Sequence, residues 1–306
     1  MSLYLGIDTS NYTTSVAVVG DCQVNSRKII DIKEGMRGIR QSDGVFVHLK
    51  ELPQLFDTLE IDMSKVCAVG VSTTPRRCEG SYMPVFLAGE SFAKVIAKSL
   101  GVPLYAYSHQ EGHIMAGILS GGFYELLEKP FLAVHLSGGT TEILKCEYKN
   151  NHFEAEIVGG TLDISAGQLI DRLGVKMGMK FPCGKEIDKL SQECSEKPIK
   201  LKTSVKDGYI NFSGMETRLL DMVGTHDDGL LAKSALTFVG ESLVKAINSI
   251  DASDVLFVGG VASNSLLRKY FEKNISADVH FATPELSCDN AVGVAELARH
   301  KYEKIL

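Results

Sequence analysis

Two histidines four residues apart are the first candidates for chemistry in this sequence. His109 and His113 belong to the segment Ser-His-Gln-Glu-Gly-His, which follows a short apolar run at a point where a helix is expected to begin. A four-residue spacing places both imidazoles on one face of a helix, as a metal site requires. Glu111 does not directly follow the first histidine, so the zinc-protease pattern is absent. Two histidines without a ligand, at the surface or in the core, remain an alternative interpretation.

A carboxylate from another part of the chain is expected to complete such a metal site. Two neutral imidazoles leave a divalent ion under-coordinated. Asp289 is the candidate, because it stands directly before the last expected helix. The same position also suits a plain helix N-cap. We therefore treat His109, His113 and Asp289 as the candidate metal ligands and catalytic residues.

Glycine-rich turns form a second class of candidate. Gly259 and Gly260 follow an apolar strand and precede a helical segment that Asn264 introduces. Glycines let the backbone approach a ligand, and the following helix N-terminus favours an anion or a polar edge. The segment is neither a phosphate-binding P-loop nor the dinucleotide fingerprint. A tight strand-to-helix turn without a ligand explains it equally well.

Two aspartates on expected helices are weaker candidates. Asp171 lies in a capped helical segment at 163–173, and Asp188 follows the turn that contains Gly184. Either carboxylate could bind ribose hydroxyls. Solvated charge on a helix surface is the more common explanation for such residues.

The elements that would position these residues form a repeated pattern. Strands at 5–7 and 16–19 flank a hydroxyl-rich turn at 8–15, and strands at 132–136 and 142–144 flank the turn 137–141. Such repetition indicates two related halves, although short Gly/Ser/Thr turns also recur by chance.

Strands that alternate with helices favour an α/β architecture, with ligands at the carboxyl ends of strands. The expected elements are a buried strand at 66–72, a helix at 84–100, a helix at 232–250 and a strand at 255–258. We expect a first lobe at 1–128, a second lobe at 129–285, and a helix at 286–306 that returns to the first lobe.

Composition narrows the class of protein. The chain has 306 residues, 44% apolar and 23% charged, which is enough for a large core. No apolar run is long enough for a membrane span, and no secretory signal is expected. The seven cysteines are scattered without a Cys-x-x-Cys pair, which favours free thiols and a cytoplasmic location. The net charge of −6 argues against general attraction of a polyanion, so contact with RNA needs a local patch or a partner.

Seven ordered segments together resemble the tRNA threonylcarbamoyladenosine synthase family, also called glycoproteases or O-sialoglycoprotein endopeptidases. They span nearly the whole chain. The matching segments are Gly-Ile-Asp-Thr-Ser at 6–10, His-Gln-Glu-Gly-His at 109–113, Leu-Ser-Gly-Gly at 136–139, the helix at 163–171 with the turn and Ile-Asp at 184–188, Phe-Ser-Gly at 212–214, Gly-Gly-Val-Ala-Ser-Asn at 259–264, and Asp-Asn at 289–290.

The resemblance implies a two-lobed actin-like, Hsp70-like or sugar-kinase superfold with duplicated mixed sheets flanked by helices. It implies one divalent metal, iron or zinc with magnesium possible, on His109, His113 and Asp289. It also implies an adenine nucleotide between the lobes. The expected nucleotide and substrate residues are Asp8, Ser137, Gly138, Gly139, Asp171, Gly184, Asp188, Gly259, Gly260 and Asn264.

By the same resemblance, the protein transfers threonylcarbamoyl from threonylcarbamoyl-AMP to N6 of the adenosine next to the tRNA anticodon. The implied partners are tRNA, a smaller related subunit and an ATPase subunit. Two segments depart from the family pattern: Asn-Tyr-Thr-Thr at 11–14, and 74–81, which contains Arg76 and Arg77. These arginines suit a bound phosphate or carboxylate, although an exposed basic turn explains them too. The alternatives are a paralogue with another acceptor and a non-catalytic nucleotide-binding partner of a true synthase.

Overall fold

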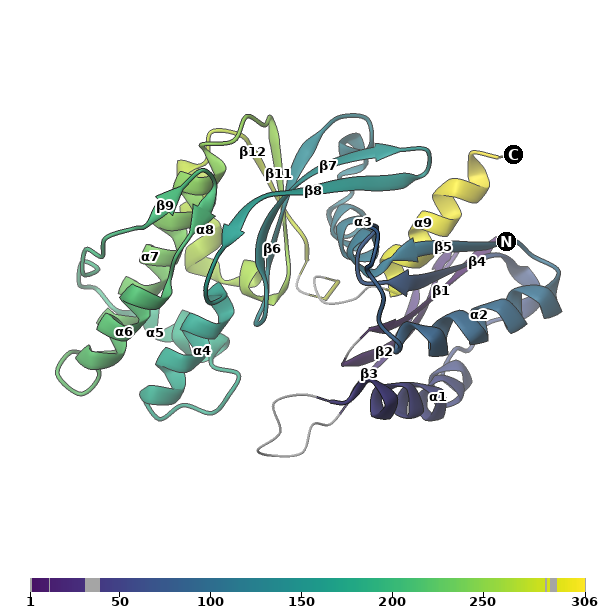
Figure 1. Ribbon diagram of the computed structural model, residues 1–306, viewed down its shortest axis with the longest axis horizontal. Helices are drawn as coiled ribbons and strands as arrows, with labels where there is room; N and C mark the ends of the chain where they lie inside the picture. The colour runs from purple at the N-terminus through teal and green to yellow at the C-terminus, as the bar shows by residue number, and fades with distance from the viewer. Residues whose placement is uncertain (1, 11, 31–38, 284, 287–290, 306) are drawn as a thin grey trace. The chain divides into compact units, whose positions relative to one another are not determined.

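The chain forms two compact α/β units, which are coloured along the sequence in Figure 1. The computed structural model describes residues 2–305 except 11, 31–38, 284 and 287–290. Unit 1 comprises Met1–Gly122, Tyr148–Glu154 and Cys288–Leu306, and unit 2 comprises Phe123–Glu147 and Ala155–Ser287. Each unit contains a mixed sheet with packed helices, which confirms the expected fold class.

Unit 1 is built on a five-stranded sheet of order β3-β2-β1-β4-β5. Its strands are β1 (Leu3–Ser10), β2 (Thr13–Gly20), β3 (Val24–Ile29), β4 (Val66–Thr74) and β5 (Leu104–Ser108). The expected hairpin at the start of the chain is confirmed. The prediction of a long polar turn at 8–15 is wrong, because β1 continues to Ser10 and β2 begins at Thr13. Asp8 pairs with Ser15 in the ladder, and both side chains are buried. Polar residues extend these strands because their side chains find hydrogen-bond partners inside the unit.

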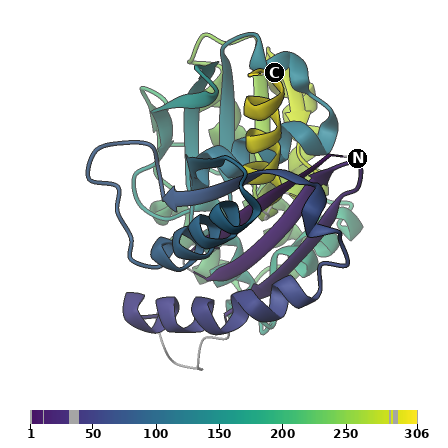
Figure 2. The same ribbon diagram turned by 90° about the vertical axis from the view of Figure 1, so that its right-hand side faces the viewer.

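Helices cover both faces of this sheet (Figure 2). They are α1 (Gln41–Asp57), α2 (Phe86–Leu100), α3 (His109–Gly121) and α9 (Ala291–Glu303), with a short 3-10 turn η1 (Met63–Lys65). Ile7 and Gly6 point to opposite faces because side chains alternate along a strand. Ile7 faces α2, whereas a side chain at Gly6 would collide with the backbone of Ala291 in α9. Gly6 therefore lets α9 lie directly on β1.

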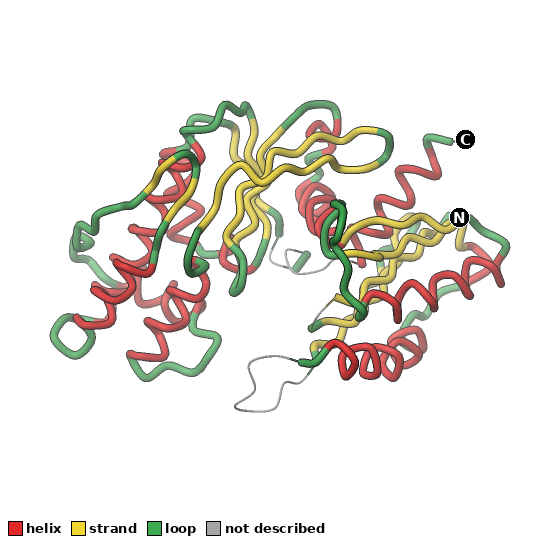
Figure 3. The backbone as a smooth tube through the Cα atoms, in the orientation of Figure 1, coloured by secondary structure: helices red, strands yellow, loops and turns green. Residues whose placement is uncertain are grey.

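Unit 2 is built on a seven-stranded sheet of order β12-β11-β6-β7-β8-β10-β9. Strands are drawn in yellow and helices in red in Figure 3. Its strands are β6 (Phe131–Leu136), β7 (Thr141–Lys149), β8 (His152–Thr161), β9 (Val205–Lys206), β10 (Tyr209–Ile210), β11 (Asp254–Val258) and β12 (Asp278–Phe281). The tip of the β7–β8 hairpin, Tyr148–Glu154, belongs to unit 1.

The helices of unit 2 pack on α7, whose 20 residues are largely buried. They are α4 (Ala166–Lys176), α5 (Gly184–Glu193), α6 (Ser213–Met222), α7 (Asp228–Ile247) and α8 (Ser265–Asn274), with 3-10 turns η2 (Tyr124–Leu127) and η3 (Gly260–Ser263). The expected helix at 163–173 begins later, because Ser165 is its N-cap and Asp163 lies before it. Asp163 instead accepts hydrogen bonds from the backbone N–H groups of Phe212 and Ser213, at 2.9 Å each.

The two sheets repeat one topology. In unit 1, β1 pairs antiparallel with β2 and parallel with β4, and in unit 2, β6 pairs antiparallel with β7 and parallel with β11. The order β3-β2-β1-β4-β5 thus corresponds to β8-β7-β6-β11-β12, and β9 and β10 extend the second sheet. The internal repeat expected from the two hairpins is confirmed.

Two further expectations concern the whole chain. In the described part of the chain, no helix is both long enough and apolar enough to cross a membrane. The described cysteines are all free thiols.

Candidate functional site

Asp8 is a buried carboxylate held by residues from three elements of unit 1. It lies near the end of β1 and is fully buried. Its Oδ1 accepts a hydrogen bond from the Ser72 hydroxyl on β4, and both of its oxygens lie 3.1 and 3.2 Å from Nδ1 of His109. Burial disfavours the charged form, but His109 and the hydroxyls of Ser72 and Ser10 outweigh this effect and lower the pKa of Asp8. Asp8 therefore orients His109 as a fixed negative charge.

His109 and His113 lie together on one face of α3, as their spacing predicts. Their ring centroids are 4.7 Å apart. Nδ1 of His109 faces the carboxylate of Asp8, which is the usual arrangement behind a metal-bound histidine. The two imidazoles lie close together with Asp8 behind His109, as a site for a divalent ion on His109 and His113 would require.

The third expected ligand cannot be placed with them. Asp289 lies outside the described residues, as does Asn290. Among the residues that the structure does describe, no group of three or more His, Cys, Asp or Glu side chains is arranged to hold a metal ion. The role of Asp289 as the third metal ligand therefore remains a prediction.

A buried glutamate fixes the start of α3. The Ser108 Oγ accepts a hydrogen bond from the N–H of Glu111 at 3.2 Å, and the Glu111 carboxylate accepts one from the N–H of Ser108 at 2.7 Å, which completes a capping box. The same carboxylate accepts hydrogen bonds from the Ser108 hydroxyl and from the N–H of Phe153, and it lies 3.1 Å from Nδ1 of His152. This network holds the first turn of α3, where His109 lies.

The turn between β6 and β7 presents open backbone. The N–H of Ser137 donates to the carbonyl of Thr140 at 2.9 Å, and the Ser137 hydroxyl accepts from the N–H of Thr140 at 3.0 Å. A Cβ built at Gly138 or Gly139 meets no atom within 4 Å. Backbone polar groups are therefore accessible to a ligand at this turn.

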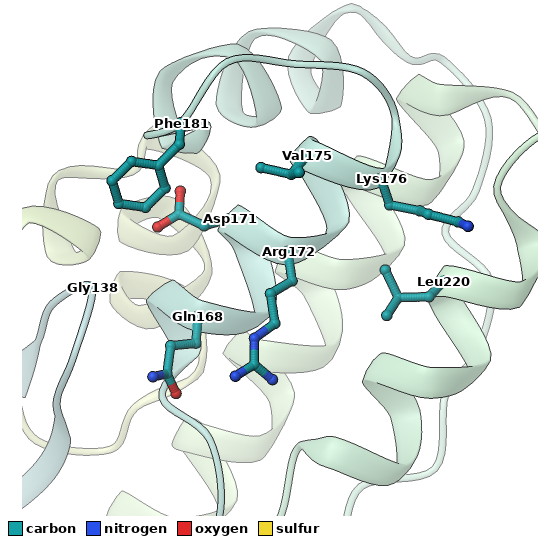
Figure 4. A pocket seen from close by; sticks show the side chains of 8 residues that line it. All are labelled: Gly138, Gln168, Asp171, Arg172, Val175, Lys176, Phe181 and Leu220. Carbon is teal, nitrogen blue, oxygen red and sulfur yellow. The ribbon is translucent and has the colours of Figure 1, made fainter. Parts of the chain in front are cut away.

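Asp171 lies on α4 beside the same turn. A cavity of about 640 Å³ is lined by Gly138, Gln168, Asp171, Arg172, Val175, Lys176, Phe181 and Leu220. Figure 4 shows the carboxylate of Asp171 beside the ring of Phe181, with Gln168 toward Gly138. Asp171 also accepts a hydrogen bond of 2.8 Å from the N–H of Cys183, the residue before Gly184. Asp171 thus combines a structural contact with a position in the cavity wall.

Asp188 contacts the start of α8, which Asn264 caps and which follows Gly259 and Gly260 in the chain. One oxygen of Asp188, on α5, accepts a hydrogen bond of 3.0 Å from the N–H of Ser265. Asn264 caps α8 through a 3.0 Å bond from the N–H of Leu267. The other oxygen of Asp188, Oδ1, is buried and has no hydrogen-bond partner among the described residues. A buried acceptor without a partner is costly, so this atom suits a ligand hydroxyl.

Gly259 brings this point close to the β6–β7 turn. Its φ of +98° suits glycine, and a Cβ there would collide with the carbonyl of Leu136, the last residue of β6. Gly260 opens the 3-10 turn η3, which separates β11 from α8. Helix α8 then begins at Ser265 with Asn264 as its N-cap, as the sequence predicts.

Sequence reasoning missed three side chains around these residues. Ser72 holds Asp8, and His152 contacts Glu111. His48, on α1, is fully buried, and its Nδ1 lies 2.8 Å from the hydroxyl of Thr14. All three contacts join residues more than 30 positions apart, so no local pattern marks them.

The repeated sheets, with candidate ligand residues near the end of β1 and after β6 and β11, define a protein of the actin-like superfold. The structure of (R)-2-hydroxyglutaryl-CoA dehydratase component A from Acidaminococcus fermentans is similar, with a TM-score of 0.58 and 13% sequence identity. The match covers 99% of this chain and 100% of that one.

Within that superfold, the chain belongs to the tRNA N6-adenosine threonylcarbamoyltransferase (TsaD) family, whose model matches residues 48–296. The enzyme of that name from Thermosipho africanus is 30% identical, over 99% of this chain and 95% of the relative. An enzyme of the same name from Thermus thermophilus is 31% identical, over 98% and 93%. The family resemblance stated from the seven segments is confirmed.

Proposed function

We propose that this protein transfers the threonylcarbamoyl group of threonylcarbamoyl-AMP to N6 of the adenosine next to the anticodon of tRNA. The observation that carries the proposal is the full-length match to transferases of this name, together with the ordered Asp8 and histidine arrangement on β1 and α3. In the reaction, the adenosine amine forms a bond to the carbamoyl carbon and releases one proton, the bond from that carbon to the phosphate oxygen breaks, and AMP leaves.

Unit 2 supplies the proposed nucleotide contacts. Asp188 would accept hydrogen bonds from ribose hydroxyls, because its buried Oδ1 lacks a partner among the described residues. The open turn at Ser137, Gly138 and Gly139 would offer the backbone N–H groups of its two glycines to the phosphate. The remaining proposed contacts come from residues around these two points: Asp171, Gly184, Gly259, Gly260 and Asn264.

Unit 1 supplies the proposed metal ligands. His109, His113 and Asp289 would hold a divalent ion, iron or zinc by family likeness, with magnesium as a further option. When bound, such an ion would polarise the carbamoyl donor and stabilise charge on its oxygen. Asp8 would orient His109 through Nδ1, as a carboxylate behind a metal-bound histidine does.

The proposed partners are tRNA, a smaller related subunit and an ATPase subunit. The test is a reconstitution of the purified chain with threonylcarbamoyl-AMP, the partner subunits and unmodified tRNA. Nucleoside mass spectrometry then measures threonylcarbamoyladenosine. We expect the modified nucleoside only when all components are present.

The control reaction uses tRNA whose target adenosine is replaced by guanosine, and it should yield no product. If the chain consumes threonylcarbamoyl-AMP but leaves tRNA unmodified, the acceptor is another molecule and the proposal is wrong in that part. If AMP binds and no donor is consumed under any condition, the chain is a nucleotide-binding partner and the proposed transfer is wrong.

A further inference from the structure

The loop that follows β4 carries two adjacent arginines on an ordered backbone. The N–H of Arg76 donates to the hydroxyl of Ser81 at 3.0 Å, which closes the loop on itself. The N–H of Gln110 donates to the carbonyl of Pro75 at 3.0 Å, which attaches the loop to the first turn of α3. Arg76 and Arg77 therefore stand on a fixed frame beside the helix that carries His109.

The arginines line an open recess. Its volume is about 380 Å³, and its walls are Thr74, Arg76, Arg77, Cys78 and Glu79. These lining residues include two guanidinium groups and one carboxylate, so together they carry a net positive charge. A guanidinium presents a planar fork of N–H donors that matches the oxygens of a phosphate.

Arg77 keeps donors for an external ligand. Its side chain is 51% exposed, and its Nη1 lies 3.8 Å from Oε1 of Glu111. That glutamate is 2% exposed and already accepts hydrogen bonds from Ser108 and Phe153 while contacting His152. A single long contact to a carboxylate with other partners engages little of the guanidinium, which has five N–H donors.

Unit 1 carries a further cation that acts on His152 together with Arg77, and an exposed ring that follows the arginines in the sequence. Burial lowers the pKa of His152, the carboxylate of Glu111 opposes this effect, and the positive charges of Arg77 and Lys301 lower the pKa further, so both charges act on that imidazole. Lys301 places Nζ 4.8 Å from the ring centroid of Tyr105 on β5. Tyr82, at the end of the arginine loop, is 62% exposed. Arg77 and Tyr82 are both exposed, and an exposed cation combined with an exposed ring is typical of contacts to a single-stranded nucleic acid.

We propose that Arg76 and Arg77 form a binding site for a backbone phosphate of the acceptor RNA. This inference rests on the proposed function and names the residues of this chain that hold the acceptor. An RNA phosphate suits the site better than the phosphate of a small donor, because the recess is open and the arginine loop ends at an exposed tyrosine, Tyr82. A chain with net charge −6 also needs such a local positive site to approach a polyanion.

The test measures the affinity of the full-length chain for an unmodified anticodon stem-loop RNA between about 50 and 200 mM salt. We expect Arg76→Gln and Arg77→Gln each to weaken binding roughly three- to tenfold and to reduce the slope of log K against log salt by about one. Arg27→Gln is the matched control. It removes the same charge from an exposed position on β3, at the opposite edge of the same sheet.

Arg77→Lys retains the charge and loses the fork, so it should keep the salt slope and recover only part of the affinity. If Arg76→Gln and Arg77→Gln bind RNA as tightly as the wild type and Arg27→Gln do, the inference is wrong. Product formation by the wild type would in that case leave the proposed function intact. If the variants lose AMP affinity instead, the arginines serve a small-molecule phosphate and the inference is wrong. If the wild type neither binds nor modifies RNA, both proposals fail together.

Discussion

The two units share a strand order but present different chemistry after their first hairpin strand. In unit 1, that strand carries Asp8, which is fully buried and held by Ser72 and His109. In unit 2, the corresponding strand ends in the turn with Gly138 and Gly139, where a Cβ meets no atom within 4 Å. Unit 1 therefore holds charged side chains in place at this strand, whereas unit 2 leaves the backbone of its turn accessible to a ligand.

The helices beside these strands show the same contrast. Both α3 and α4 begin with a capping box, Ser108 with Glu111 and Ser165 with Gln168. Glu111 is charged and buried within a network that reaches Phe153 and His152, whereas Gln168 is neutral and lines a cavity. The same fold in both units can thus hold a buried carboxylate network in one and a ligand cavity in the other. The backbone fixes the positions of these residues, and the side chains at those positions determine the chemistry.

The largest expected effect comes from removing the two imidazoles of unit 1. His109→Ala with His113→Ala should abolish metal retention and lower the transfer rate by about a thousandfold, because the donor loses its electrostatic support. Elemental analysis and nucleoside mass spectrometry measure the two quantities. His226→Ala is the control, since it removes an exposed imidazole from unit 2. Full metal content in the double variant would show that His109 and His113 do not hold the metal.

The matching change in unit 2 should affect nucleotide binding and leave metal content unaltered. Asp188→Ala removes the acceptor for ribose hydroxyls and the bond to the N–H of Ser265. We expect the affinity for AMP, measured by calorimetry, to fall about ten- to a hundredfold. Glu193→Gln on the same helix is the control, because Glu193 is exposed and pairs with the exposed Lys189. Wild-type chain that gives no heat with AMP, ADP or ATP would refute the assignment of the nucleotide to unit 2.

The two capping boxes allow the contrast to be measured as stability. Glu111→Ala should lower the free energy of unfolding by about 2–4 kcal/mol, because buried donors of Ser108 and Phe153 lose their acceptor. Gln168→Ala removes one bond at the same helix position and should cost about 1 kcal/mol. Urea unfolding measures both values. Equal losses would mean that the Glu111 network adds nothing beyond a helix cap.

Local patterns in the sequence were enough to predict the repeated hairpins and the pairing of His109 with His113. Each depends on spacing of a few residues, which the periods of strand and helix translate directly into geometry. Asp163 shows the limit of this reasoning. A helix start was expected there, but its carboxylate accepts the N–H groups of residues about 50 positions away.

Contacts between distant segments could not be predicted for the same reason. Ser72 on Asp8 and His152 on Glu111 depend on which strand and which hairpin tip meet in the folded unit. Nothing in the residue types near Asp8 indicates that a serine 64 positions away holds it. The candidate residues could be named from the sequence, whereas the side chains that orient them could not.

The smallest expected effect concerns Asp254, the first residue of β11 in unit 2. It lies at the end of this strand opposite to Gly259. Asp254 is buried beside Lys129 at 2.8 Å and His280 at 3.0 Å. Burial raises its pKa, but hydrogen bonds from Lys129, Ser253 and His280 prevail and lower it to about 2.

A carboxyl group whose pKa is lower in the folded state stabilises the fold above its unfolded pKa of about 4, and this stabilisation is lost as the pH falls toward about 2. The stability advantage of wild type over Asp254→Asn should therefore be constant above about pH 5 and shrink steadily below about pH 4. Thermal unfolding from neutral to acidic pH measures this difference. A difference that does not change with pH would mean that Asp254 acts through packing, and unit 2 would then lack a fixed charge comparable with Asp8 in unit 1.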